Sequence, residues 1–281
     1  QIAYYTDVLG LTLNAKEKDA AFLASTLDHH SVVLRKGGSG DKGQCVRLGF
    51  QVGLDDDLGE FEKQTKAQGI KTERKSDPEP SISELLSFED PKGTVMEVFR
   101  RADVPPQKFA TKGVVPHKLG HVAFFVKDVK KVTDFYCNVL GFRVSDWMGD
   151  TFSFLRCGVD HHTINLMQDP ENRHFHTAFE LRDWGHMLTA CDTLSLAGYK
   201  LLWGPGRHGI GHNLFTYHRG PNGLITELFA QLDQMNEEMG YFEPRPWHRD
   251  RPQSPKVWSK DPNAANYWGI MPVMPEDQMH K

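Results

Sequence analysis

Apolar and polar residues alternate along residues 119–126, as in a strand with one buried face. Asp128 then offers a helix cap, and apolar residues keep helical spacing until Gly141, a residue suited to end a helix. Strand-like runs follow near residues 142–146, 151–156 and 161–167. This order predicts a βαβββ unit.

The same order then begins again. A strand-like run covers residues 174–181, and a helical pattern from Trp184 to Ala197 ends at Gly198. Three more strand-like runs lie near residues 199–203, 212–218 and 224–230. Residues 117–231 are therefore predicted to form a module of two βαβββ units.

The first part of the chain resembles this module. Tyr4 to Leu11 resembles Phe135 to Phe142, Asp28-His29-His30 matches Asp160-His161-His162, and Pro91-Lys92-Gly93 matches Pro221-Asn222-Gly223, which brings Glu97 onto Glu227. Matches in one order at a nearly constant separation predict an internal repeat. We expect homologous modules at residues 1–102 and 117–231, a linker at 103–116 and a Pro- and Trp-rich tail at 232–281. The first module lacks the pattern of a leading strand, so we expect the sequence to begin inside its first helix.

Composition narrows the function. The 281 residues include 33 Lys and Arg against 37 Asp and Glu, a formal charge of −4 that argues against a nucleic-acid partner. The apolar runs are much shorter than the roughly 18 to 20 residues that a membrane span needs. The four cysteines show no CxxC spacing, which favours free thiols in a reducing cytoplasm.

Three polar residues interrupt otherwise apolar strand faces. His121 shares a face with Ala123, His176 with Ala178, and Glu227 with Phe229. Each alone is more often a hydrogen-bonded structural residue. Together, two imidazoles and a carboxylate that leave coordination positions open suit non-haem Fe(II), and Mn(II) accepts the same ligands.

The first module provides an internal control. At the same offsets, Arg47 takes the place of His176, whereas Glu97 remains. If these side chains served only packing, both modules would need them. The difference indicates that the second module alone carries the chemistry.

At this point the sequence resembles a known family, the type I extradiol ring-cleaving dioxygenases of the vicinal oxygen chelate superfamily. The motifs that carry the resemblance are Leu119-Gly120-His121-Val122-Ala123-Phe124, His174-Phe175-His176-Thr177-Ala178-Phe179, Thr226-Glu227-Leu228-Phe229, Gly204-Pro205-Gly206-Arg207-His208-Gly209, and Asp160-His161-His162-Thr163. The resemblance implies an α+β fold of tandem βαβββ modules, the vicinal oxygen chelate or glyoxalase-like fold.

The resemblance also implies residue roles. His121, His176 and Glu227 would bind the metal, and His162 would be the acid/base that accepts a proton from the substrate and returns it to an oxygen intermediate. His161, on the opposite face of the same predicted strand, would be structural, although a slip of one residue would exchange the two. Further roles are assigned to Tyr217 and His208, which would hold the substrate oxygens, and to the pocket residues Phe154, Trp203 and Trp268.

The implied activity is cleavage of a catechol by O2 to a ring-opened semialdehyde. The tail resembles that of the homoprotocatechuate 2,3-dioxygenase branch, in which it covers the mouth of the active site and helps subunits to associate, and a homotetramer is implied. In that branch two arginines hold a substrate carboxylate, whereas Trp203 and Ala265 stand in their places here. We therefore expect neutral or apolar ring substituents, unless Arg207, Arg249 or Arg251 replaces the lost charges.

Alternatives remain for single residues and for the whole chain. Tyr217 is also compatible with an ordinary strand aromatic, His208 with a solvated loop residue, and Trp203 and Phe154 with core residues. The rival functions are another metal-dependent enzyme of the superfamily, such as a glyoxalase-like isomerase or an epoxide thiol transferase, and a small-molecule binding protein.

Overall fold

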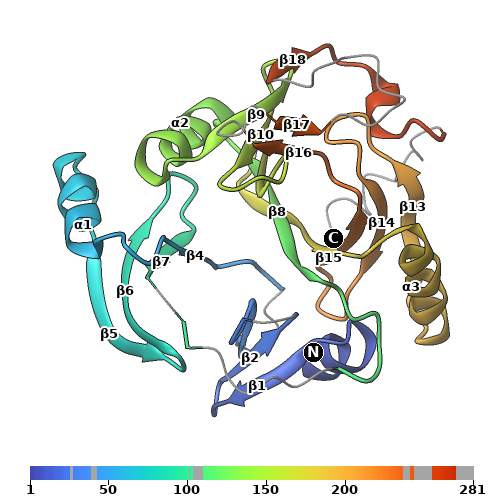
Figure 1. Cartoon of the computed structure of the whole chain (residues 1–281), viewed down its shortest axis with the longest axis horizontal. Helices are drawn as coiled ribbons and strands as arrows, with labels where there is room; N and C mark the ends of the chain where they lie inside the picture. Colours follow the sequence, from blue (N-terminus) through green and yellow to red (C-terminus); the bar gives the residue numbers. More distant parts are fainter. Residues whose placement is uncertain are drawn as a thin grey trace.

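The computed structural model describes residues 1–25, 28–38, 43–100, 102–103, 110–236, 241–243 and 255–269. Its largest sheet has nine strands in the order β13-β14-β15-β12-β8-β11-β10-β9-β18. Eight of these strands come from residues 118–230 and form two βαβββ units, which confirms the predicted fold (Figure 1). The first unit consists of β8 (Lys118–Val126), α2 (Val129–Leu140), β9 (Arg143–Met148), β10 (Phe152–Arg156) and β11 (Ile164–Gln168). The second consists of β12 (Arg173–Glu180), α3 (Trp184–Leu196), β13 (Leu201–Arg207), β14 (Leu214–Arg219) and β15 (Ile225–Ala230).

The N-terminal part forms two smaller sheets. A π-helix, η1 (Tyr4–Val8), precedes a three-stranded sheet of β1 (Thr12–Lys16), β2 (Ala20–Ala24) and β3 (Val32–Arg35). A four-stranded sheet contains β4 (Arg47–Gln51), β5 (Glu73–Glu79), β6 (Ile82–Glu89) and β7 (Val95–Phe99), together with α1 (Leu58–Ala67). Their counterparts in the C-terminal module, β9–β11 and β12–β15, are joined into one sheet by β8, which lies between β11 and β12.

The helix boundaries follow from local capping. Asp128 accepts a hydrogen bond from the backbone nitrogen of Lys131 at 2.9 Å, and Gly141 ends α2 at a φ of 72°. Asp183 caps α3 in the same way, and Gly198 follows that helix at a φ of 85°. None of the described helices combines the length and the apolar character needed to cross a membrane.

Two predicted strand boundaries are wrong. The run expected at 161–167 begins at Ile164, because the preceding segment pairs instead with the start of the tail: His161 N donates to Asp233 O at 2.8 Å, and Asp160 bridges to Gln234. The run expected at 199–203 begins at Leu201 and extends to Arg207, so the first four residues of the Gly204 to Gly209 motif are strand, and β13 pairs with β14.

The two modules share their hydrophobic cores. One core combines the β4–β7 sheet and α1 with β8, α2, β10 and β11, and includes Met96 and Leu166. The other combines η1 and β1–β3 with α3, β14 and β15, and includes Leu9 and Leu228. Figure 1 shows this arrangement, with α1 beside α2 and with β1 and β2 below β15. The opposite face of β15 carries Glu227 between the buried residues Ile225 and Phe229.

The described part of the tail contributes three short strands and one 3-10 helix. β16 (Gln234–Asn236) pairs with β17 (Tyr241–Glu243), and β18 (Lys256–Trp258) adds to the edge of the large sheet by parallel pairing with β9. The 3-10 helix η2 (Pro262–Ala265) follows. The predicted tail is therefore attached to the C-terminal module at 255–269, and residues 270–281 lie outside the described residues.

Candidate metal centre

The candidate site is a single row of side chains across five strands. His121 on β8 is paired with Ala178 on β12, and Ala178 is paired with Glu227 on β15. Glu227 is paired with Tyr217 on β14, which in turn is paired with Trp203 on β13. Directly paired residues point to the same face of a sheet, so the ladder brings these side chains together.

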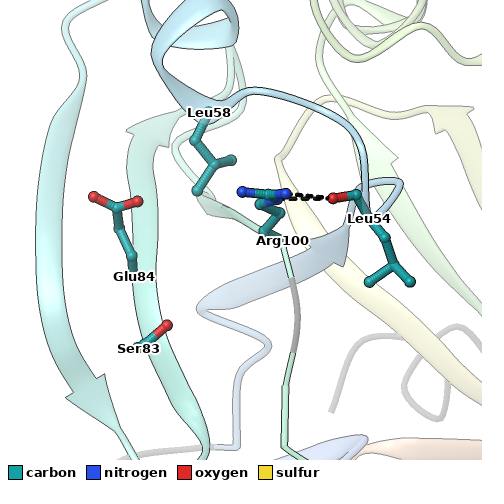
Figure 2. A pocket seen from close by; sticks show the side chains of 5 residues that line it. All are labelled: Leu54, Leu58, Ser83, Glu84 and Arg100. Atoms are coloured by element: carbon teal, nitrogen blue, oxygen red, sulfur yellow. Dashed lines mark hydrogen bonds between the residues drawn. The ribbon is translucent and has the colours of Figure 1, made fainter.

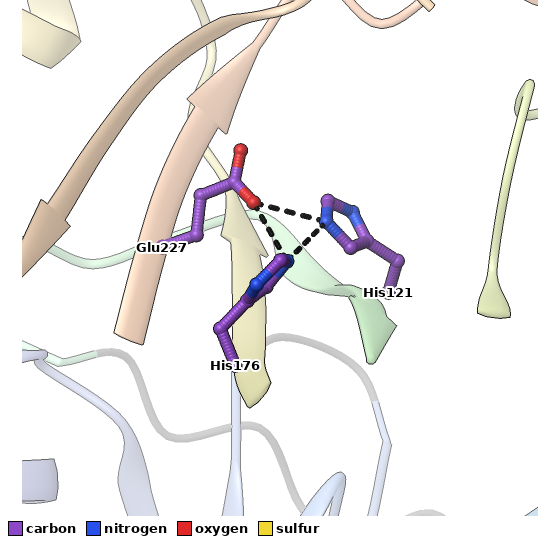
Figure 3. Close-up of side chains that lie close together, drawn as sticks. All are labelled: His121, His176 and Glu227. Atoms are coloured by element: carbon purple, nitrogen blue, oxygen red, sulfur yellow. Dashed lines mark hydrogen bonds and ion pairs between the residues drawn. The ribbon is translucent and has the colours of Figure 1, made fainter. Parts of the chain in front are cut away.

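Two members of this row, His121 and Glu227, converge with His176 from β12 (Figure 3). His121 Nε2 lies 3.2 Å from His176 Nε2, and Glu227 Oε2 lies 3.0 Å from each of these nitrogens. All three side chains are buried. Ligands that share one face of an octahedron, with bonds of about 2.1 Å, are about 3.0 Å apart, whereas a tetrahedral arrangement would separate them by about 3.4 Å. The donor set and its spacing therefore fit a single divalent metal ion bound by all three side chains.

The carboxylate is held in the form that a metal requires. Burial alone raises the pKa of Glu227, but the adjacent His121 and His176 outweigh burial and hold that pKa well below its usual range. Asn213 Nδ2 donates to the other oxygen, Oε1, at 3.1 Å. A hydrogen bond of this kind orients a ligand carboxylate. The sequence interpretation missed Asn213, which stands outside the repeat matches used there.

His162 lies directly against the converging ligands. The centroid of its ring is 4.5 Å from that of His121. Burial, followed by the nearby His121 and His161, lowers the pKa of His162 well below its ordinary value, so the ring is neutral. His161 instead bonds to Asp146, with Nε2 3.0 Å from Oδ2. The structure thus places His162 toward the candidate site and His161 toward Asp146.

Tyr217 and His208 form a second group beside the triad. The Tyr217 hydroxyl donates to His208 Nε2 at 3.0 Å, and His208 Nδ1 donates to the backbone oxygen of Ala265 at 2.7 Å. Burial, above all, raises the pKa of Tyr217 well above its usual value and lowers that of His208 to about 4. Both groups are therefore neutral, and His208 is fixed by the tail rather than solvated in a loop.

Two of the three predicted pocket residues lie in this region. The Phe154 ring centroid is 5.5 Å from that of His162, and Trp203 stacks on Tyr217 with centroids 5.4 Å apart. Trp268 is 53% exposed and packs against Trp184 and over Arg207. Phe154 and Trp203 therefore lie at the candidate site. Trp268 lies at the surface, in contact with Trp184 and Arg207.

The N-terminal module contains a separate surface pocket of about 380 Å3. Figure 2 shows its lining residues, Leu54, Leu58, Ser83, Glu84 and Arg100. The Arg100 guanidinium donates to the backbone oxygen of Leu54 at 2.6 and 2.9 Å, and Glu84 pairs with Arg74. Arg100 is therefore hydrogen-bonded to the backbone, and Glu84 is paired with an arginine outside the pocket lining.

The chain is similar to known proteins along most of its length. A family model described as the Glyoxalase/Bleomycin resistance protein/Dioxygenase superfamily matches residues 1–98 and 118–228. A manganese-dependent 2,3-dihydroxybiphenyl 1,2-dioxygenase from Geobacillus genomosp. 3 is 23% identical over 91% of this chain and 87% of the relative. Metapyrocatechase 2 from Cupriavidus necator is 34% identical over a shorter stretch, which covers 43% of this chain and 38% of the relative.

A solved structure is similar along nearly the whole chain. It is the Mn(II)-bound glyoxalase from Novosphingobium aromaticivorans, with a TM-score of 0.83 and 28% identity over 98% of this chain and 87% of the other. The matched proteins thus include one named as a manganese-dependent dioxygenase and a solved structure with bound Mn(II).

Proposed function

Because the chain belongs to the Glyoxalase/Bleomycin resistance protein/Dioxygenase superfamily, we propose that it is an extradiol dioxygenase, which cleaves a catechol ring beside its diol. The observation that carries this proposal is the triangle of His121, His176 and Glu227, with 3.0 to 3.2 Å sides, and neutral His162 against it. The three ligands leave coordination positions for the two catechol oxygens and O2.

The metal would be Fe(II) or Mn(II), held by His121, His176 and Glu227. A manganese-dependent relative and the Mn(II)-bound neighbour support this pair of metals. When bound, the ion would supply Lewis acidity toward the catechol oxygens and a site at which O2 can react.

The chain's own residues provide the rest of the chemistry. Neutral His162 accepts a proton from a catechol hydroxyl and later returns one, as general acid/base catalysis requires. Tyr217 and His208, held by their mutual hydrogen bond, contact the substrate oxygens. Phe154 lines the side next to His162 and excludes water from the proton transfer. The product is a ring-opened semialdehyde that keeps both atoms of O2.

A glyoxalase-like isomerisation is the second candidate, and the name of the Novosphingobium protein favours it. In enzymes of that type, and in the epoxide thiol transferases of the superfamily, the ligands come from both modules or from paired chains. Here all three converge from β8, β12 and β15 of one module. This arrangement favours the dioxygenase and also argues against a small-molecule binding protein, which has no need of a metal triad.

Anaerobic reconstitution tests the proposal. The protein is loaded with Fe(II) or Mn(II), mixed with catechol, and exposed to 18O2. We expect a coloured ring-fission product that carries both labelled atoms, and no product from the Glu227→Ala variant. Isomerisation of the methylglyoxal–glutathione adduct without O2 uptake, together with no ring cleavage, would establish the second candidate instead.

We further propose that the preferred catechols carry neutral or apolar substituents. The side of the pocket at Trp203 presents an aromatic surface, with Phe215 4.4 Å and Tyr217 5.4 Å away between ring centroids. Arg207 is buried and donates to the backbone oxygen of His212 at 2.7 Å and to Gln231 at 2.9 Å, so it is already engaged. Arg249 and Arg251 lie outside the described residues. A substrate carboxylate at Trp203 would lose hydration without gaining a cation.

Direct competition tests this preference. We expect a higher kcat/KM for 3-methylcatechol than for 3,4-dihydroxyphenylacetate, because only the latter brings a carboxylate that would lose hydration without gaining a cation. The Trp203→Arg variant should shift the ratio toward the carboxylated substrate, whereas Trp203→Phe should not. A wild-type preference for the carboxylated catechol contradicts the proposal.

We also propose a cytoplasmic homo-oligomer, a homotetramer by the family resemblance. The free thiols Cys45, Cys137, Cys157 and Cys191 support a reducing compartment. Analytical ultracentrifugation measures the assembly, and a monomer at micromolar concentration contradicts it.

A further inference from the structure

A buried carboxylate lies behind the acid/base histidine. Asp146 on β9 is 1% exposed. Its Oδ2 accepts hydrogen bonds from His161 Nε2 at 3.0 Å and from the Trp258 indole nitrogen at 2.7 Å, and its Oδ1 accepts one from the backbone nitrogen of Lys256 at 3.0 Å. The carboxyl group acts as the acceptor in each of these three bonds.

These bonds determine where the protons of two neighbouring histidines lie. His161 must carry its proton on Nε2 to donate to Asp146. A neutral imidazole has only one N–H, so Nδ1 of His161 is an acceptor. Nδ1 of His162 lies 2.9 Å from it and is therefore the donor. As a result, Nε2 of His162 is unprotonated.

We propose that Asp146 and His161 are positioning residues that hold His162 with an unprotonated Nε2, ready to take the proton of a catechol. The inference rests on the proposed function and deepens it. The His162 ring has its centroid 5.2 Å from that of His161 and 4.5 Å from that of His121. The nitrogen that does not face His161 is thus the one available to the substrate.

The N-terminal module shows what the histidine pair does without this carboxylate. Ala15 is paired with Phe22 on β2, as Asp146 is paired with Phe154 on β10. His29 and His30 are nevertheless present, with their Nδ1 atoms 2.8 Å apart. A histidine pair of this kind therefore forms without an aspartate at that strand position, so Asp146 is not needed merely to build the pair. The carboxylate occurs in the module that has the metal ligands.

The tail completes the arrangement. Lys256 and Trp258 are at the ends of β18, which pairs with β9 opposite Asp146 to Met148. Two of the three hydrogen bonds to Asp146 therefore come from the tail. Removal of one of them should weaken the positioning without touching substrate or metal.

Histidine tautomers can be measured directly. The full chain, labelled with 15N in its histidines, is studied by NMR without metal and with diamagnetic Zn(II), and the His162→Asn variant assigns the signals. We expect His162 to be protonated on Nδ1 and His161 on Nε2. A proton on His162 Nε2, or two protons on His161, overturns the proposal. This measurement does not depend on any enzymatic activity.

Kinetics of the Asp146→Asn variant provide the functional test. We expect metal content and KM for catechol to stay within about twofold of wild type, while kcat falls by about 10- to 100-fold. Trp258→Phe should lower kcat by a smaller factor in the same pattern. The matched control is Asp90→Asn, another buried carboxylate, which accepts from Tyr136 in the shared core and should leave kcat unchanged.

The outcomes separate the two proposals. If wild type cleaves catechols and both Asp146→Asn and Trp258→Phe keep the full kcat, the positioning role is refuted and the proposed function stands. If wild type cleaves no catechol, the proposed function fails, and the 15N spectra still decide the tautomer. If Asp146→Asn does not fold, Trp258→Phe and the wild-type spectra carry the test.

Discussion

The last strand of each module carries a glutamate at the same register, but one glutamate faces an arginine and the other faces two histidines. Glu97 on β7 is paired with Gly49 on β4, just as Glu227 on β15 is paired with Ala178 on β12. Glu97 Oε2 lies 2.8 Å from the Arg47 guanidinium, whereas Glu227 faces two imidazoles. A guanidinium provides the cation within the protein, and the imidazole pair leaves that role to a metal.

The residues next to the two glutamates differ as well. Ser87 is paired with Glu97 as Tyr217 is paired with Glu227. Arg47 also binds Glu79 at 2.8 Å, and His30, the counterpart of His162, lies 3.2 Å from that same carboxylate. In the N-terminal module the same register positions thus hold ion pairs within the protein, which shows that the fold does not require the metal ligands.

The largest expected difference is in metal binding. Glu227→Ala removes one of three ligands and should weaken Fe(II) or Mn(II) binding by more than about 100-fold and abolish turnover. Glu97→Ala should leave the metal content unchanged, because Arg47 excludes a divalent cation from that module. Metal analysis of both purified variants, with circular dichroism to verify folding, measures the contrast. Full metal occupancy in Glu227→Ala would refute the assignment.

Substitution of the two equivalent histidines should give the next largest contrast. His162→Asn should slow the steps after O2 arrives by about 10²- to 10⁴-fold, since it removes the acid/base group. His30→Asn should leave these steps unchanged. Stopped-flow mixing of the anaerobic catechol complex with O2 is the measurement. Equal rates in the two variants would show that His162 does not act as the acid/base.

A smaller effect is expected from the pair Tyr217 and Ser87. Tyr217→Phe removes a hydrogen bond worth about 1.5 kcal/mol, so kcat should fall about tenfold. Ser87→Ala, at the equivalent place beside Glu97, should have no effect on kcat. Steady-state kinetics with a single catechol measure both, and a full kcat in Tyr217→Phe would assign the tyrosine to packing.

The smallest effect on catalysis is expected for Glu79, whose substitution should change the stability of the protein at low pH. Burial alone would raise the pKa of Glu79, but His30 and Arg47 lower it from 4.5 to about 2. A carboxyl group with a depressed pKa stabilises the folded state fully above its unfolded pKa, and that stability is lost as the pH falls from about 4.5 toward 2. Acid unfolding followed by fluorescence should show a smaller pH dependence over this interval for Glu79→Gln. An unchanged acid transition would contradict the ion-pair role, and kcat at pH 7 should equal that of wild type.

Some features of the site were predictable because they depend on local pattern. The alternation around His121, His176 and Glu227 placed each on an otherwise apolar face, and Asp128 and Gly141 marked the ends of a helix. The strand predicted near residues 199–203 was placed too early, because its second half, Gly204 to Arg207, is rich in glycine and proline. Glycine and proline favour turns locally, but pairing with β14 stabilises this segment as strand.

The sequence by itself determined the repeat, the order of elements, the triad and the difference between Arg47 and His176. Each of these features depends only on residue types and their spacing along the chain. Only the tertiary structure decided that β8 lies between β11 and β12, that each core is shared between modules, and that Asp146 meets His161 and the tail. Asp146 and Trp258 are 112 residues apart, and Asn213 and Glu227 are on different elements. Contacts of this kind depend on how strands and tail pack, and packing is a property of the whole chain that no local pattern encodes.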